Sequence, residues 1–234
     1  MTPHALDRPI WGALFGRQTS FSVGDERARR YLGDISPLAA AADDSPESLS
    51  ALAAIAPGDG ALVLLQLGET PLPPGLEMTK SAKGVQMVAW EPVAPVTCDF
   101  RIVQLQEADA QEMLALATLT EPGPFLSRTH RLGRFLGVRI GGRLAAMTGE
   151  RMKLDGFTEV SGVCTHPDFR GRSLAGALSA AVARSIQERG ETPFLHAYSS
   201  NMPAIRLYER LGFRLRCEVS VAVLQRQPPP PTGS

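Results

Sequence analysis

The chain has 234 residues, of which 44% are hydrophobic and 21% are charged, so it is long enough to bury a core as one extended or two compact domains. Lysine and arginine together number 24, as do aspartate and glutamate, which gives a formal net charge of +0. This balance excludes a protein that binds nucleic acid or an anionic membrane through its overall charge.

The first 97 residues predict a small α/β unit. An alanine-rich stretch near Ser45 to Ala56 predicts a helix, and the apolar run ALVLLQL at residues 61–67 predicts a strand. The run DERARRY at residues 25–31 mixes charges at helical spacing, which favours a solvated face with local ion pairs. Two prolines then interrupt the pattern at residues 89–100, AWEPVAPVTCDF, so we place a domain boundary between residues 97 and 98.

Residues 98–227 predict a second unit, in which helices alternate with strands of a mostly antiparallel sheet. Apolar residues recur at three- and four-residue intervals from Glu107 to Leu119 and predict a helix. The strands RFLGVRI and RLAAMTGERM follow, joined by Gly141 and Gly142. Because glycine takes positive φ readily, this dipeptide favours a tight hairpin.

The strand predicted at residues 157–167, FTEVSGVCTHP, leads through a loop into a helix with an apolar stripe from Leu174 to Ile186. A strand at 193–199, a helix at 202–211 and a last strand through 213–224 complete the order. This order indicates a mixed α/β (α+β) layer architecture. The proline-rich residues 228–234 have nothing to bury and predict a disordered tail.

The segment CTHPDFRGRSLAG, residues 164–176, places two arginines, a glycine and a serine between the end of a strand and the start of a helix. Unpaired amides at a helix N-terminus favour an anion, and guanidinium groups add charge-assisted contacts. Gly171 lets the backbone come close to such an anion. The loop therefore predicts a local anion site.

Two motifs in this half resemble those of the GNAT superfamily of acyl-CoA-dependent N-acyltransferases. RGRSLA at residues 170–175 resembles the superfamily's pyrophosphate loop, although Ser173 stands where glycine is usual. NMPAIRLYERLGF at residues 201–213 resembles its Asn, Ala, Leu-Tyr-Glu, Leu-Gly-Phe signature. The resemblance implies a GNAT catalytic domain at residues 98–227. Residues 1–97 look like the degenerate acyltransferase-like half of two-part members.

This resemblance implies that an acetyl group moves from acetyl-CoA (coenzyme A) to an amine by direct attack in a ternary complex. The acceptor would be a small-molecule or peptide amine, and a homodimer is compatible with this fold. A non-catalytic CoA-binding or regulatory module is the alternative, and a structural partner protein is a third reading. The residues expected to hold the cofactor are Val163 and Thr165 through their backbone, Arg170, Gly171, Arg172, Ser173, Leu174 and Ala175 in the loop, and Asn201, which otherwise caps its helix.

Glu159 and Tyr208 are the candidate catalytic residues. Glu159 lies on the strand before the loop and is the candidate base, acting through water because a carboxyl of pKa about 4.3 is a poor acceptor for an ammonium of pKa about 10.4. The alternative is an ion pair of Glu159 with Arg139 or Arg151. Tyr208 is the candidate acid for the leaving thiolate, or a hydrogen-bond donor to it, and the alternative is a core tyrosine.

The remaining polar residues predict no further site. The cysteines and histidines show no metal-ligand spacing, His196 is expected to be packed in the sheet, and no histidine is placed to activate Cys164. Three scattered cysteines favour a reducing compartment. The sequence shows neither a signal peptide nor a long apolar span, so we expect a cytoplasmic protein with no membrane or nucleic-acid partner and no metal.

Overall fold

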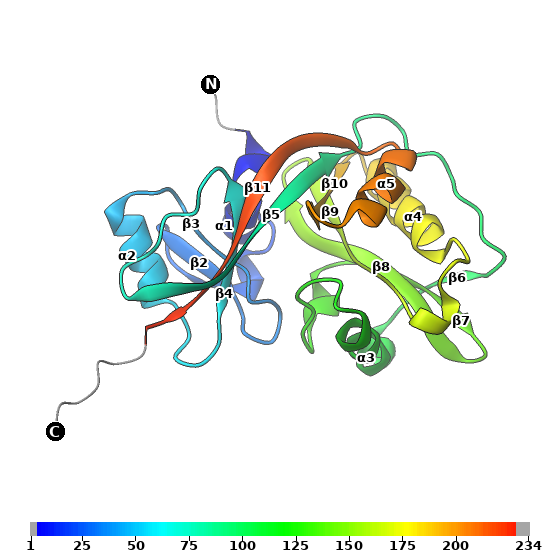
Figure 1. Cartoon of the computed structure of the whole chain (residues 1–234), viewed down its shortest axis with the longest axis horizontal. Helices are drawn as coiled ribbons and strands as arrows, with labels where there is room; N and C mark the ends of the chain where they lie inside the picture. Colours follow the sequence, from blue (N-terminus) through cyan, green and yellow to red (C-terminus); the bar gives the residue numbers. More distant parts are fainter. Residues whose placement is uncertain (1–3, 228–234) are drawn as a thin grey trace.

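The computed structural model describes residues 4–227, and the tail predicted at 228–234 lies outside them. Its α-helices and β-strands follow one another along these residues (Figure 1). The helices are α1 (Pro9–Phe15), α2 (Pro46–Ala54), α3 (Ala110–Thr120), α4 (Leu174–Glu188) and α5 (Met202–Arg210). The strands are β1 (Ser22–Gly24), β2 (Ala28–Tyr31), β3 (Ala39–Ala41), β4 (Leu62–Leu67), β5 (Leu76–Val88), β6 (Ile102–Gln104), β7 (Phe135–Ile140), β8 (Arg143–Leu154), β9 (Phe157–Thr165), β10 (Thr192–Tyr198) and β11 (Arg214–Arg226).

An eight-stranded sheet with the order β4-β11-β5-β10-β9-β8-β7-β6 runs through the molecule. Neighbouring strands pair antiparallel except β9 and β10, which are parallel. A separate three-stranded sheet, β1-β2-β3, lies in the N-terminal part. The predicted mixed α/β (α+β) architecture with a mostly antiparallel sheet is confirmed.

Helices cover both faces of the large sheet. One face packs against α4 and α5 in the largest buried cluster, where the predicted stripe from Leu174 to Ile186 is buried. Side chains that alternate to the opposite face, among them Phe194 and Phe135, pack with α1 and α3. Figure 1 shows α4 and α5 on one side of β8 and α3 on the other. No helix within residues 4–227 is long and apolar enough to cross a membrane.

Strands from the N-terminal part join the same sheet as the C-terminal strands. β5 lies between β10 and β11, with Val85 opposite Ala197 of β10 and Glu218 of β11. β4 pairs with the other edge of β11. The expected division between residues 1–97 and 98–227 therefore does not separate two sheets. The β5 strand escaped notice in the sequence because lysine, serine and glycine interrupt its apolar residues.

Two local expectations had opposite outcomes. Gly141 and Gly142 have φ values of 58° and 81°, and the predicted hairpin between β7 and β8 is confirmed. The charged run at residues 25–31, by contrast, forms a turn and strand β2 rather than a face at helical spacing. The Asp25 side chain accepts hydrogen bonds from the amides of Arg27 at 2.8 Å and Ala28 at 3.1 Å. Such a turn competes with a helix at the same residues.

Candidate functional site

Strands β9 and β10 part from one another in the middle of the large sheet. They pair from Phe157 opposite Thr192 to Glu159 opposite Phe194, and no further pairing between them exists in the described chain. On its other side β9 stays paired with β8, with register irregularities on either side of the stretch from Gly149 to Glu150. The residues of β9 after Glu159 therefore turn one unpaired backbone edge toward an opening, and those groups need other hydrogen-bond partners.

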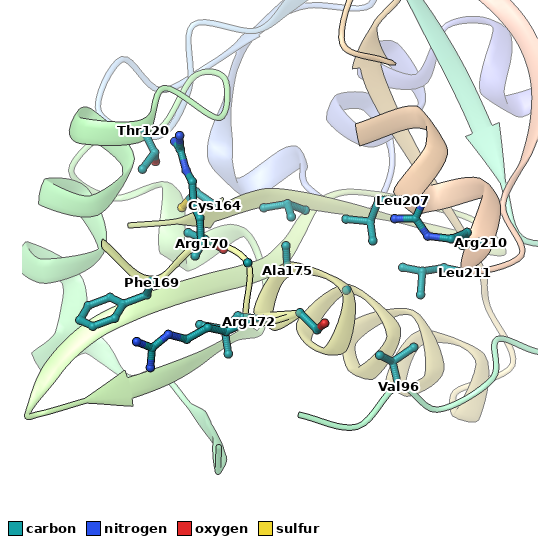
Figure 2. A pocket seen from close by; sticks show the side chains of 16 residues that line it. Val96, Thr120, Cys164, Phe169, Arg170, Arg172, Ala175, Leu207, Arg210 and Leu211 are labelled. Atoms are coloured by element: carbon teal, nitrogen blue, oxygen red, sulfur yellow. The ribbon is translucent and has the colours of Figure 1, made fainter. Parts of the chain in front are cut away.

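A cavity of about 630 Å³ lies beside this opening (Figure 2). Its walls come from the end of β9, the loop before α4, the first turn of α4, the last turn of α5 and the linker before β6. It is lined by Val96, Thr120, Val163, Cys164, Thr165, Phe169, Arg170, Gly171, Arg172, Ser173, Leu174, Ala175, Gly176, Leu207, Arg210 and Leu211. All the predicted cofactor residues except Asn201 are in this set, whereas Glu159 and Tyr208 are outside it.

The loop before α4 presents free backbone donors to the cavity. The amides of residues 171–176 find no backbone acceptor within the described part of the chain. Gly171 has a φ of 77°, which turns the chain into the helix at little steric cost. Since α4 is 15 residues long, its positive N-terminal end adds to the attraction for an anion.

Three exposed arginines line the cavity: Arg170, Arg172 and Arg210. None forms an ion pair within residues 4–227. The Arg172 guanidinium lies 5.7 Å from the ring centre of Phe169 and 5.9 Å from that of Phe100. These unpaired charges give the cavity a positive potential although the chain as a whole is neutral.

Ser173 precedes α4 in a left-handed conformation, with φ 56° and ψ 15°. A residue with a Cβ loses about 1 kcal/mol or more in this region relative to glycine. The serine side chain makes no capping hydrogen bond that would offset this cost. The conformation explains physically why glycine suits this position.

Thr165 and Asn201, both predicted to serve the cofactor, differ in their surroundings. Thr165 belongs to the cavity lining, but its hydroxyl is buried from solvent and has no hydrogen-bond partner among the described residues. Asn201 caps α5, where its Oδ1 accepts from the Ala204 amide at 3.3 Å. The capping alternative that the sequence left open is therefore what the structure shows for Asn201.

Glu159 is fully buried and bound to Arg151. The Arg151 Nε and Nη2 atoms each donate to one carboxylate oxygen at 2.7 Å, and His196 Nδ1 lies 2.8 Å from Oε1. Burial acts to raise the pKa of Glu159, but the charge and hydrogen bonds of Arg151, together with His196, outweigh it and lower the pKa to about 2. Of the two ion pairs weighed from the sequence, the one with Arg151 is present. A carboxylate held in this way is a poor proton acceptor.

The hydrogen bonds around His196 determine which ring nitrogen carries the proton. Gln86 Oε1 accepts from Arg216 Nη1 at 2.9 Å, so the Gln86 Nε2 amide faces His196 Nε2 at 3.0 Å. Because Gln86 donates there, His196 Nε2 accepts, and His196 Nδ1–H donates to Glu159. The sequence analysis missed Gln86, since only the pairing of β5 with β10 brings it opposite His196.

Tyr208 is next in sequence to the lining residue Leu207 but is not itself among the lining residues. Its ring is buried against Phe213, with ring centres 6.1 Å apart, and burial raises the pKa of Tyr208 to about 12. Its hydroxyl makes no hydrogen bond within residues 4–227. The phenol thus stays protonated at neutral pH and is available to donate a hydrogen bond.

A second, much smaller cleft lies on the other side of β9. It has a volume of about 10 Å³, room for one water molecule, and lies between residues 122–125, Arg151 and the β9 residues Ser161 and Gly162. Gly162 lines this cleft while its neighbour Val163 lines the large cavity.

The cysteines and metal-binding residue types add no second chemistry to the described chain. Burial raises the pKa of Cys164 to about 11, so its thiol stays protonated and is a weak nucleophile. Within residues 4–227, no group of three His, Cys, Asp or Glu side chains is placed to hold a metal ion.

Comparisons with known proteins agree with this geometry. The FR47-like protein family model matches residues 135–222, a range that contains the loop and the motif on α5. A solved structure from Novosphingobium aromaticivorans, assigned to the GNAT family of acetyltransferases, is 44% identical with a TM-score of 0.90 and covers 97% of this chain and 100% of that chain.

Two curated mycothiol acetyltransferases are similar over shorter stretches. The protein of Thermomonospora curvata is 34% identical over 99 residues, 42% of this chain, and that of Corynebacterium aurimucosum is 38% identical over 60 residues, 25% of this chain. These stretches span 32% and 20% of the two relatives. Such short stretches give no basis for assigning the acceptor of these relatives to this chain.

Proposed function

Because the chain belongs to the GNAT family of acetyltransferases, we propose that it transfers an acetyl group from acetyl-CoA to an amine of a small-molecule or peptide acceptor. The observation that carries this proposal is the row of acceptor-free amides at residues 171–176, beside the point where β9 and β10 part. A helix N-terminus of this kind suits a diphosphate. The open strand edge suits an extended arm with amide groups of its own.

The residues present fit coenzyme A. The cavity of about 630 Å³ is of the size that small-molecule sites use. Arg170, Arg172 and the loop amides would hold the diphosphate, and the backbone of Val163 and Thr165 would pair with the pantetheine arm. When bound, the coenzyme supplies the acetyl thioester.

We assign Tyr208 to the leaving sulfur. Its pKa of about 12 exceeds the ordinary thiol pKa of about 8.5, so complete proton transfer from Tyr208 to a thiolate would be uphill by about 5 kcal/mol. A hydrogen bond from the neutral phenol needs no such transfer. Tyr208 therefore stabilises developing negative charge by donating a hydrogen bond.

We do not propose that Glu159 accepts the proton of the acceptor amine, because its carboxylate already binds Arg151 and His196. Both ring nitrogens of His196 are also hydrogen-bonded, one to Glu159 and the other to Gln86. We propose that the amine loses its proton to solvent in the opening. Glu159 is then a positioning residue, since its network ties β8, β9, β10 and β5 together where β9 and β10 begin to part.

Two measurements test the proposed function. Calorimetry with acetyl-CoA is expected to show saturable binding, and a thiol-release assay with a panel of small-molecule and peptide amines is expected to show turnover with at least one of them. Saturable binding with no thiol release for any amine would support a non-catalytic CoA-binding module instead. Absence of binding by folded protein would refute both readings.

A further inference from the structure

The small cleft beside β9 has a single charged side chain in its wall. Of the nine described residues that line it, Arg151 alone is charged. The others are two prolines, two glycines, two phenylalanines and the hydroxyl residues Thr129 and Ser161. An anion in this cleft would therefore meet one cation and no carboxylate among the lining residues. The apolar walls would strengthen the attraction, because charges interact more strongly away from water.

The protein itself uses one edge of the Arg151 guanidinium. The Nε and Nη2 atoms donate to the two carboxylate oxygens of Glu159 at 2.7 Å each. The Nη1 atom makes no hydrogen bond within residues 4–227 and is not sealed off from solvent. Because a guanidinium carries five N–H donors, the edge formed by Nη1 and the second hydrogen of Nη2 is free to bind another planar anion.

The Arg151 side chain is held in place before any ligand arrives. It is 9% exposed, and the Glu159 carboxylate that holds it is bound in turn by His196 Nδ1 at 2.8 Å. Gln18 Nε2 donates to the Arg151 carbonyl at 2.7 Å and fixes the backbone. Binding through a long side chain costs less entropy when that side chain is already ordered. Arg151 is therefore prepared to bind a ligand through its free edge.

The Ser161 hydroxyl supplies a second donor in the same cleft. It makes no hydrogen bond within the described residues and is not sealed off from solvent. The cleft volume of about 10 Å³ holds one water molecule or one oxygen atom of similar size. The cleft can therefore take the end of a small anionic group, and its size favours a planar carboxylate over a tetrahedral phosphate.

Strand β9 forms a wall of both the small cleft and the large cavity. Gly162 lines the cleft and the next residue, Val163, lines the cavity, and the Cα atoms of consecutive residues are about 3.8 Å apart. From this point the inference rests on the proposed function, in which the backbone of Val163 pairs with the pantetheine arm. A small acceptor that meets the coenzyme at this stretch of β9 has its other end near the cleft.

We infer that Arg151, together with the Ser161 hydroxyl, binds a carboxylate of the acceptor, so that the substrates are small amines that also carry a carboxylate. The free edge of the guanidinium matches a carboxylate through two charge-assisted hydrogen bonds. Arg151 then binds two carboxylates, one on each edge: that of Glu159, which orients it, and that of the acceptor, which it selects. Neither Arg151 nor Glu159 takes the proton of the amine.

The test compares kcat/KM for amines with and without the carboxylate. Glycine, β-alanine and γ-aminobutyrate are each compared with their own amide in the thiol-release assay. For at least one chain length the wild-type protein is expected to prefer the acid about tenfold or more, the size of a charge-assisted contact. Because the amide group makes a nearby amine less basic, amine reactivity alone would favour the amides.

Three variants locate the source of this preference. Arg151→Lys keeps a positive charge but loses the fork, and is expected to bring the acid and its amide within about threefold of one another. Ser161→Ala leaves the ion pair of Arg151 intact and is expected to lower the preference about threefold. The control is Arg134→Gln, which is expected to keep the full preference, because Arg134 is next to the lining residue Phe135 but donates to Ser185 Oγ at 3.1 Å.

The preference is a ratio measured in one preparation, so it does not depend on the fraction of protein that is folded. Equal kcat/KM for acids and amides in the wild-type protein would overturn the inference and leave the proposed function intact. An Arg151→Lys variant that keeps the full preference would do so too, as would turnover of other amines but of none of these acids. Absence of thiol release with every amine would remove the proposed function and the carboxylate site with it.

Discussion

Replacing Glu159 with glutamine separates a positioning carboxylate from a catalytic base. In the folded protein the pKa of Glu159 falls from its ordinary value of 4.5 to about 2 because Arg151 and His196 stabilise the charged form against burial. A carboxyl with a lowered pKa stabilises the fold fully above pH 4.5, and this contribution is lost as the pH falls toward 2. The difference corresponds to about 3 kcal/mol at pH 7.

Glu159→Gln also leaves Arg151 buried without its counter-charge, and a broken buried pair costs about 3 to 5 kcal/mol. We expect urea denaturation, followed by circular dichroism, to show a loss of this size at pH 7. The gap between wild type and variant is expected to narrow by about 2 kcal/mol at pH 3, where the unfolded wild-type carboxyl is already protonated. The double variant with Arg151→Gln is expected to cost less than the sum of the two single variants.

The activity of the same variant completes the test. Once the folded fraction is corrected for, the pH dependence of kcat/KM is expected to keep the wild-type shape, because solvent takes the proton. A base contributes about 10²- to 10⁴-fold to turnover. A loss of that size in folded Glu159→Gln, or a stability gap that does not change with pH, would refute the positioning role.

Substitutions at three other positions test the site. Tyr208→Phe is expected to lower kcat about tenfold or more in steady-state assays with little change in coenzyme affinity by calorimetry, and unchanged turnover would exclude the hydrogen bond to sulfur. Ser173→Gly is expected to raise the free energy of unfolding by about 0.5 kcal/mol, because relief of the left-handed strain exceeds the added entropy of the unfolded chain, whereas Ser173→Ala is expected to give no gain. Asn201→Ala is expected to lower the free energy of unfolding by about 1 kcal/mol through loss of the α5 cap, and an unchanged denaturation midpoint would contradict this.

The loop before α4 and the helices around it are read well from the sequence because their causes are local. Gly171, the following apolar stripe of α4 and the cap at Asn201 each act over a few residues, and each stands where the pattern predicts it. The same holds for the hairpin at Gly141 and Gly142. The helical spacing inferred for residues 25–31 was wrong because the charge pattern does not show the turn that Asp25 forms with the amides after it.

The role of Glu159 could not be read from its own strand. The partners of Glu159 are Arg151 on β8 and His196 on β10. Gln86, which hydrogen-bonds to His196, is 110 residues away from His196 in the sequence. Burial by these strands and the arginine beside it set the pKa of the carboxyl. The spacing of residues along β9 predicts neither the burial of Glu159 nor the presence of the arginine beside it.

By itself, the sequence determined that a loop rich in glycine and arginine starts a long amphipathic helix, and that this pair resembles a phosphate-binding motif. Only the tertiary structure decided that β5 from the N-terminal part lies between β10 and β11, that Glu159 is bound by Arg151 and His196, and that Arg210 of α5 lines the same cavity as the loop before α4. The physical reason is range. Backbone conformation and capping respond to neighbours in the chain, whereas burial and ion pairing respond to neighbours in space.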